Sequence, residues 1–266
     1  MDTTQFDEAH DRARAAGTEE TAEFAAVLAT ARAGFASDPP LWLMRLRLVL
    51  SDIAKLPASP QLTADAETAV HEILEYARAG AADDPTRLDL LTTLLNSHAL
   101  DLEQAGRIDE SRVLAEEQLA LVQALAASSA PGPNAESMLA HSRSHTAELR
   151  LRTGDAAGAF ELADALVDTA RLNGEDPSAG PSGLPSWLRL RARSLAALGD
   201  GVRARADFEA ALEWERARLR AGRFLAHLDL AEALDGYAEL LQSLGDGAGA
   251  QAATVQAQRV RTEKTA

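Results

Sequence analysis

Three side chains of the sequence have a spacing that could hold a metal ion. His141, His145 and Glu148 are four and three residues apart, so on a helix they share one face. Imidazole nitrogens and carboxylate oxygens are ligands that zinc takes in proteins. A zinc site needs three or four protein ligands, and the sequence points to no fourth one. We therefore predict no metal and no cofactor, and interpret these residues as ordinary surface or groove positions.

A second segment, Gly245-Asp246-Gly247-Ala248-Gly249, has the glycine content of a phosphate-binding loop. A dinucleotide-binding loop needs a strand before it, and a nucleotide-binding loop needs a Lys followed by Ser or Thr. Neither is present, so the segment is interpreted as a turn between two helices. The chain has no cysteine, and none of its serines or histidines stands in a nucleophile elbow or a similar catalytic motif. The sequence thus predicts a protein that is not an enzyme.

The elements that position these side chains recur with a period of about 46 residues. Two sets of helix-ending residues mark the period: Pro39, Pro85, Pro131 and Pro177 are each 46 apart, and Gly106, Gly154, Gly199 and Gly245 follow at intervals of 48, 45 and 46. Proline stops a helix, and glycine supplies the left-handed conformation that ends one. Between these markers the composition favours helices, and no stretch alternates with period two. Each unit is therefore predicted to be a helix, a tight turn, a second helix and a longer loop.

Small residues stand at fixed distances from the turn glycines. The residue seven before each glycine is Ala99, Ala147, Ala192 and Ala238, and the residue five after it is Ser111, Ala159, Ala204 and Ala250. Small side chains at both places let two helices approach closely. Asp follows three of the glycines and can cap the second helix. The clearest unit runs from Trp187 to Glu215 and adds Leu188, Leu195, Phe208, Ala211 and Leu212 at helical spacing.

This pattern resembles the tetratricopeptide repeat (TPR), in the long-period form of kinesin light chains and many bacterial regulators. The resemblance is good over residues 86–258. In the second repeat Leu56-Pro57-Ala58-Ser59-Pro60 replaces the turn glycine, and the first repeat rests on Gly17, Ala22 and Ala26. The repeat around Gly154 has Arg143 and Arg150 at positions where apolar residues are expected. The resemblance implies an all-α fold, a right-handed α-solenoid of about six helix-turn-helix repeats. We expect one such domain over 1–258 and a polar tail over 259–266.

The resemblance also implies a partner groove, because the first helices of TPR repeats line the concave face. The residues ten and six before each turn glycine are Asn96, Leu100, Ser144, Glu148, Arg189, Arg193, Asp235 and Glu239. Arg189 and Arg193 could bind a carboxylate of a peptide through paired hydrogen bonds. The alternative is that Arg193 pairs with Glu239 and Arg189 with Asp235 between adjacent repeats. Neither the TPR clamp for chaperone tails nor the asparagine ladder of kinesin-type repeats is reproduced.

The segment from Leu41 to Leu50 is the most apolar of the chain and contains Arg45 and Arg47. A basic amphipathic helix of this kind can lie on a membrane. The segment begins just after Pro40, in the slot of a first helix, where neighbouring hairpins bury it. We therefore predict that it packs in the core.

The net charge of −15 disfavours direct contact with nucleic acid or an anionic membrane. No apolar run has the length of a membrane span and the first residues do not resemble a secretory signal, so we expect a cytoplasmic protein. The predicted function is a non-enzymatic interaction module that binds a peptide or a partner surface in its groove. Reversing the charges of Arg189 and Arg193 should then abolish partner capture without changing helicity. The alternative is a regulatory sensor that binds a small ligand or signalling peptide and acts through a partner, and a homo-oligomer stays open.

Overall fold

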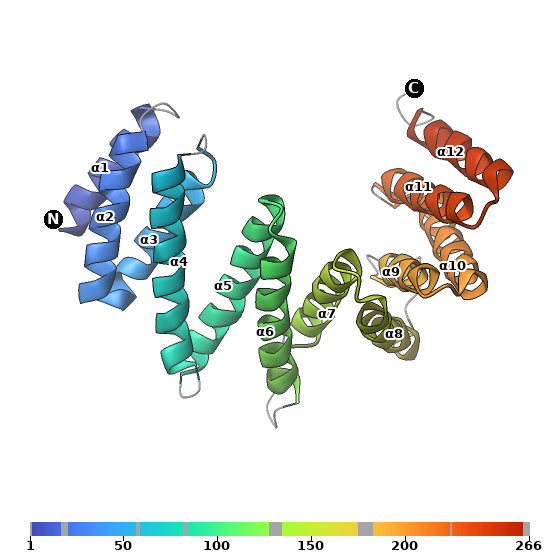
Figure 1. The fold of residues 1–266 in the computed structure, drawn as a ribbon, viewed down its shortest axis with the longest axis horizontal. Coiled ribbons are helices and arrows are strands. Elements are labelled where there is room, and N and C mark those ends of the chain that lie inside the picture. Colours follow the sequence, from blue (N-terminus) through green and yellow to red (C-terminus); the bar gives the residue numbers. More distant parts are fainter. Residues whose placement is uncertain are drawn as a thin grey trace. The chain divides into compact units, whose positions relative to one another are not determined.

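A computed structural model describes residues 2–16, 21–56, 59–81, 84–127, 135–174, 183–223 and 225–262. Within these ranges the chain forms twelve α-helices and no strand (Figure 1). They are α1 (Thr3–Ala16), α2 (Thr21–Ser37), α3 (Pro39–Ile53), α4 (Pro60–Gly80), α5 (Pro85–Gln104), α6 (Ile108–Ala126), α7 (Ala135–Arg152), α8 (Ala156–Leu172), α9 (Leu184–Ala197), α10 (Gly201–Arg220), α11 (Ala226–Ser243) and α12 (Gly247–Thr262). The predicted all-α fold of about a dozen helices is confirmed. Gly17, Pro57, Ala58, Pro131 and Pro177 lie outside the described residues.

Two compact units make up the chain, Met1–His98 and Ala99–Ala266, and α5 contributes residues to both. In the first unit, α2 packs on α1, α3 and α4. In the second unit each helix from α6 to α12 packs on the next, and α9 also contacts α7 and α11. Each unit is therefore built from consecutive helices packed side by side, and a single domain over 1–258 stays a prediction. None of the described helices is long and apolar enough to cross a membrane.

The predicted glycine turns join the helices of the second unit. Gly106, Gly154, Gly199 and Gly245 have φ angles of 76°, 86°, 85° and 80°, a conformation that side chains with a Cβ rarely adopt. The following aspartates cap the next helix as predicted: Asp155, Asp200 and Asp246 accept hydrogen bonds from the amides of Gly158, Arg203 and Gly249 at 2.9, 3.1 and 2.9 Å. The Gly245 segment is thus a helix turn.

The small residues beside these turns are buried, as the repeat frame requires. Ala99, Ala147 and Ala192 are fully buried before the turns, and Ser111, Ala159 and Ala204 after them. Ser111 Oγ donates to the carbonyl of Ala99 at 2.7 Å, which joins α6 to α5. The frame also holds in the repeat that contains Arg143 and Arg150, because Ala147 packs in one cluster with Ala159 and Ala163.

The register predicted for the first repeat is wrong. Ala22 and Ala26 of α2 are not part of its buried side, which consists of Phe24, Val27, Leu28, Ala31 and Phe35. Burying large side chains removes far more apolar area from water than burying a methyl group, so Phe24 and Leu28 decide which face turns inward. Alanine is common on both faces of helices and is therefore a poor guide to the buried one.

The apolar segment of α3 is only half in the core. Trp42, Leu46 and Val49 are buried as predicted, but Leu41, Met44 and Leu48 lie on the exposed side with 49%, 62% and 52% of their surface in solvent. The prediction of core packing is therefore wrong for this outer stripe of the helix.

Candidate functional site

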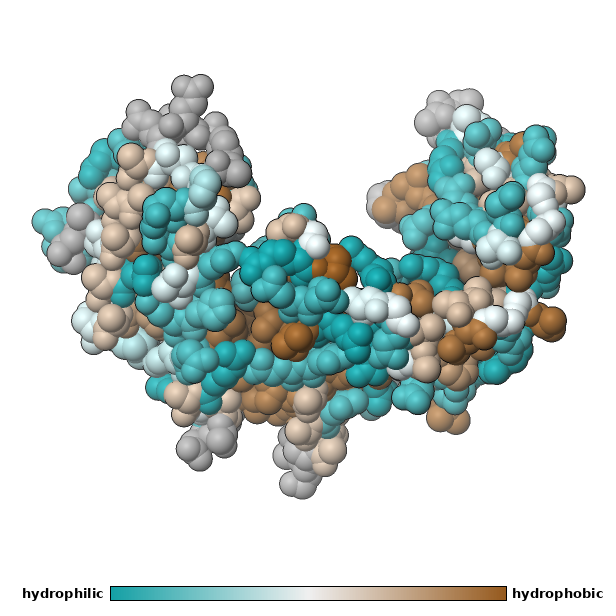
Figure 2. Space-filling model, in the orientation of Figure 1, coloured by the Kyte–Doolittle hydropathy of each residue, from teal (hydrophilic) through white to brown (hydrophobic). Residues whose placement is uncertain are grey.

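Seven of the eight predicted groove residues belong to the second unit. Leu100 lies on α5, Ser144 and Glu148 on α7, Arg189 and Arg193 on α9, and Asp235 and Glu239 on α11. We call these seven residues the first-helix face. None of them is fully buried, and Figure 2 shows hydrophilic and apolar residues mixed over α6 and α7 on the visible side of the molecule. The eighth residue, Asn96, belongs to the first unit, and its amide oxygen is buried with no hydrogen-bond partner among the described residues.

Ion pairs tie the first helices of consecutive repeats together. Arg193 donates two hydrogen bonds to Glu148, at 2.8 and 3.0 Å, and so joins α9 to α7. Arg189 donates to Glu232 at 3.1 Å and joins α9 to α11. The suggested pairs of Arg193 with Glu239 and Arg189 with Asp235 are therefore wrong, although pairing between adjacent repeats does occur. Glu148 and Arg193 are the predicted site residues that contact one another.

The acidic end of the face lies on α11. Asp235 is bonded to Arg261 of α12, while Glu239 is exposed and has no partner within the described part of the chain. Both carboxylates line a shallow cavity of about 880 Å³ between α11 and α12, together with Gln242 and Gln251. This end can accept a hydrogen bond or a basic side chain without breaking the Glu148–Arg193 pair.

Two of the three candidate metal ligands are engaged elsewhere. The His141 and His145 rings lie 6.5 Å apart, but His145 Nε2 is 3.2 Å from Glu103 and both oxygens of Glu148 are bonded to Arg193. Among the described residues no group of three or more His, Cys, Asp and Glu side chains is placed to hold a metal ion. The three side chains thus share one helical face but do not converge on one point.

A buried charge cluster under the face was missed by the sequence analysis. Arg191 donates to both oxygens of Asp207 at 2.8 Å and to Asp164 at 2.6 Å, and so connects α9, α10 and α8. A signal for it existed, because Arg191 follows Leu188 by three residues and precedes Leu195 by four, which puts it on the buried side of α9. Burial lowers the pKa of Arg191 and its two carboxylates raise it, with a net rise, so the guanidinium stays charged.

Glu215 is a second buried charge, and it lies near Arg189 of the face. It is 1% exposed and accepts a hydrogen bond at 2.9 Å from Arg218, which also donates to Asp229 at 3.0 Å. Burial raises the pKa of Glu215 above its usual 4.5, and the nearby charge of Asp229 adds to the rise. The charges of Arg218 and Arg189 act in the opposite direction. Arg189, whose side chain is 16% exposed, therefore stabilises the buried carboxylate in addition to its bond to Glu232.

The raised pKa of Glu215 predicts how stability depends on pH. A carboxyl with a higher pKa in the folded chain contributes stability below its unfolded pKa and loses it as the pH rises through the folded one. Because Gln is neutral throughout, we expect the melting temperature of Glu215→Gln to rise relative to that of the native chain as the pH increases above 4.5. Thermal unfolding followed by circular dichroism measures the difference. Glu213→Gln, on the exposed side of α10, is the control and should show no such trend; an equal trend in both variants would contradict the assignment.

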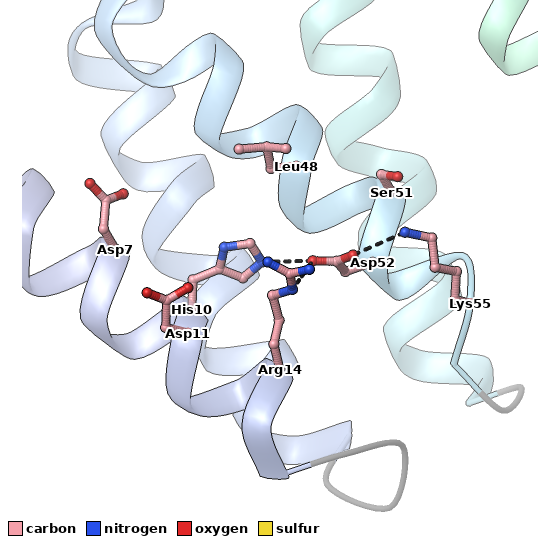
Figure 3. A pocket seen from close by; sticks show the side chains of 8 residues that line it. All are labelled: Asp7, His10, Asp11, Arg14, Leu48, Ser51, Asp52 and Lys55. Atoms are coloured by element: carbon pink, nitrogen blue, oxygen red, sulfur yellow. Dashed lines mark hydrogen bonds and ion pairs between the residues drawn. The ribbon is translucent and has the colours of Figure 1, made fainter.

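The first unit contains a smaller cavity of about 340 Å³, between α1 and α3 (Figure 3). His10 Nε2 lies 3.1 Å from Asp52 Oδ2, and Arg14 and Lys55 also bond to this carboxylate, at 3.2 Å each. A His–Asp pair could orient a general base, but the neighbouring Ser51 points away from His10 (Figure 3). The cluster therefore binds α1 to α3 and does not present a nucleophile with its base.

Solved structures with the same fold are TPR-like proteins. A crystal structure of a kinesin light chain candidate of Podosopora anserina, with nearly identical TPR-like repeats, has a TM-score of 0.54 at 20% identity. A variant of that protein, in which a glutamine is replaced by methionine, has a TM-score of 0.58 at 20% identity. Each alignment covers 83% of this chain and 96% of the other. No protein-family model matches the sequence, and comparison with curated proteins gives no match. The chain thus has a TPR-like fold, as the repeat frame predicted.

Proposed function

We propose that this protein is a non-enzymatic interaction module that binds a segment of a partner protein on its first-helix face. The observation that carries the proposal is the pairing of Arg193 with Glu148 across two repeats. This pair presents a guanidinium that is 47% exposed, on helices whose small residues pack tightly behind it. Stacked helical repeats expose a large surface for their mass, and proteins of this architecture use it for binding.

The charges of the face define the kind of segment that fits. A partner carboxylate can share or replace Glu148 on Arg193, because a guanidinium offers five donors in a fixed fork. One repeat further on, the unpaired Glu239 can receive a Lys or Arg of the same segment. A segment with an acidic and a basic residue, bound along α7, α9 and α11, satisfies both ends.

Arg189 is a poor residue for testing this function by charge reversal. A carboxylate there would face Glu232 and stand near the buried Glu215, so it would destabilise the fold itself. The expectation that reversing Arg189 and Arg193 leaves the helices unaffected is therefore replaced by a test that preserves the ion pair.

The test exchanges the two charges of the exposed pair. In Glu148→Arg/Arg193→Glu the ion pair is retained with its polarity inverted, so we expect a change in unfolding free energy below about 1 kcal/mol. A partner whose binding depends on the order of the two charges should no longer be captured by this variant. Mass spectrometry compares the proteins captured by the variant with those captured by the native chain. Glu213→Arg/Arg216→Glu inverts a comparable pair on α10 and should capture the same protein as the native chain. Unchanged capture by the Glu148/Arg193 exchange would contradict the proposed face.

A further inference from the structure

The outer side of α3 differs from the exposed sides of the other first helices. Leu41, Met44 and Leu48 are three and four residues apart, lie on one side of the helix and are about half exposed. In α5 the exposed residues include Asp89, Thr93 and Ser97, and in α9 they include Ser186 and Arg193. Single exposed apolar residues are ordinary on protein surfaces, but an aligned row of three marks a contact surface.

Two acidic side chains of α1 lie beside this row. Asp7 and Asp11 line the same cavity as Leu48, and Figure 3 shows the two carboxylates coming from α1 and Leu48 from α3. Asp7 accepts two hydrogen bonds from Arg45 of α3, both at 2.9 Å, and the His10–Asp52 contact joins the helices again further along. These contacts therefore hold α1 and α3 together in the folded chain.

Asp7, Asp11 and Asp52 line the cavity together with Arg14 and Lys55, and Asp7 is bonded to Arg45. Arg14 and Lys55 both bond to Asp52, whereas Asp11 has no partner among the described residues. A Lys or Arg that reaches Asp11 therefore meets an uncompensated carboxylate next to an apolar surface. The chain as a whole carries a net charge of −15, which disfavours a second copy or an anionic membrane as the occupant.

We propose that Leu41, Met44 and Leu48 of α3, with Asp11 of α1, form a second docking site that binds an amphipathic helix of another protein. The apolar side of that helix packs on the row, in the manner of a helix laid against an apolar groove, and one of its basic residues pairs with Asp11. The site belongs to the first unit and is independent of the first-helix face of the second unit.

The test uses a synthetic peptide of about 18 residues, built of Leu and Lys with Leu on one helical face. Two further peptides serve as controls: one with Glu in place of Lys, and one with the Leu/Lys order scrambled. Fluorescence anisotropy of the labelled peptides with the full chain should show binding of the first peptide only. We expect Met44→Glu/Leu48→Glu to weaken this binding by at least about tenfold and Asp11→Asn by about threefold. Leu172→Glu/Val202→Glu changes two still more exposed apolar residues of the second unit and should leave binding unchanged.

Equal binding of the Lys and Glu peptides, or binding that survives Met44→Glu/Leu48→Glu, would overturn the proposal. So would binding of the native chain to phosphatidylserine vesicles that Met44→Glu/Leu48→Glu abolishes, because the row would then contact lipid. A dimer in light scattering that the same variant dissociates would assign the row to a second copy instead. The Glu148→Arg/Arg193→Glu exchange should not change peptide binding, so failure of this proposal and failure of the proposed function are distinguishable.

Discussion

Replacing Gly34 with Ala should destabilise the first unit by about 1–3 kcal/mol, although Ala is the better helix former. A Cβ atom at Gly34 would lie 2.2 Å from Cδ2 and Cε2 of the Trp42 indole. This ring cannot move aside easily, because it is buried and packs edge to face against Phe6 at 5.2 Å. The absence of a side chain at Gly34 is thus what lets α2 approach α3.

Chemical denaturation measures the effect of Gly34→Ala, and Gly247→Ala is the matched control. A Cβ at Gly247, also in a helix, would meet no atom within 4 Å, so this variant should be neutral or slightly more stable. Adding Trp42→Leu to Gly34→Ala removes the clash. The double variant should therefore lose less unfolding free energy than the sum of the losses in the two single variants. Stabilisation by Gly34→Ala comparable to that of Gly247→Ala would show that the contact between α2 and Trp42 is not as described.

Replacing Arg191 with Ala should cost about 3–5 kcal/mol, the largest effect that we expect from a polar residue of the second unit. The substitution leaves the Asp207 carboxylate, whose side chain is 12% exposed, without the two hydrogen bonds that compensate its burial. Asp164 loses its partner at the same time, but it is more exposed and can be solvated.

Arg193→Ala is the control for Arg191→Ala, because it removes a similar two-bond pair on the same helix at an exposed position. Exposed pairs contribute up to about 1 kcal/mol, so burial alone should separate the two variants in urea unfolding. Arg191→Met/Asp207→Leu replaces the charges with apolar groups and should recover much of the loss. Equal destabilisation by Arg191→Ala and Arg193→Ala would contradict the importance of burial here.

The repeat frame predicted the fold because it depends on local chemistry. The left-handed turn at Gly199, the Asp200 cap and the small pair Ala192 and Ala204 are requirements of a tight helical hairpin, and all of them are met in the structure. Where the chain lacks a turn glycine, as before α4, that frame disappears. In α2 the small residues Ala22 and Ala26, counted from Gly17, gave the wrong register, whereas large side chains such as Phe24 mark the buried face.

The candidate site was less predictable, because side-chain pairing depends on the three-dimensional neighbourhood. Both Glu148 and Glu239 stood six residues before a turn glycine, and nothing in the sequence decided which of them Arg193 would reach. The buried Arg191 was overlooked because arginine is normally exposed, although its position between Leu188 and Leu195 indicated the core side. Helical spacing can place residues such as His141, His145 and Glu148 on one face, but it does not specify which of them converge.

The central claim, that the first-helix face binds a partner, is tested most directly by photo-crosslinking. A photoreactive amino acid is placed at Leu100 or Glu239, two exposed positions of the face, and at Val113 on the exposed side of α6 as the control. We predict that the first two positions crosslink the same protein of the source lysate and that Val113 does not. Crosslinking of that protein from Val113, with none from Leu100 or Glu239, would contradict the account and move the partner to the second helices of the repeats.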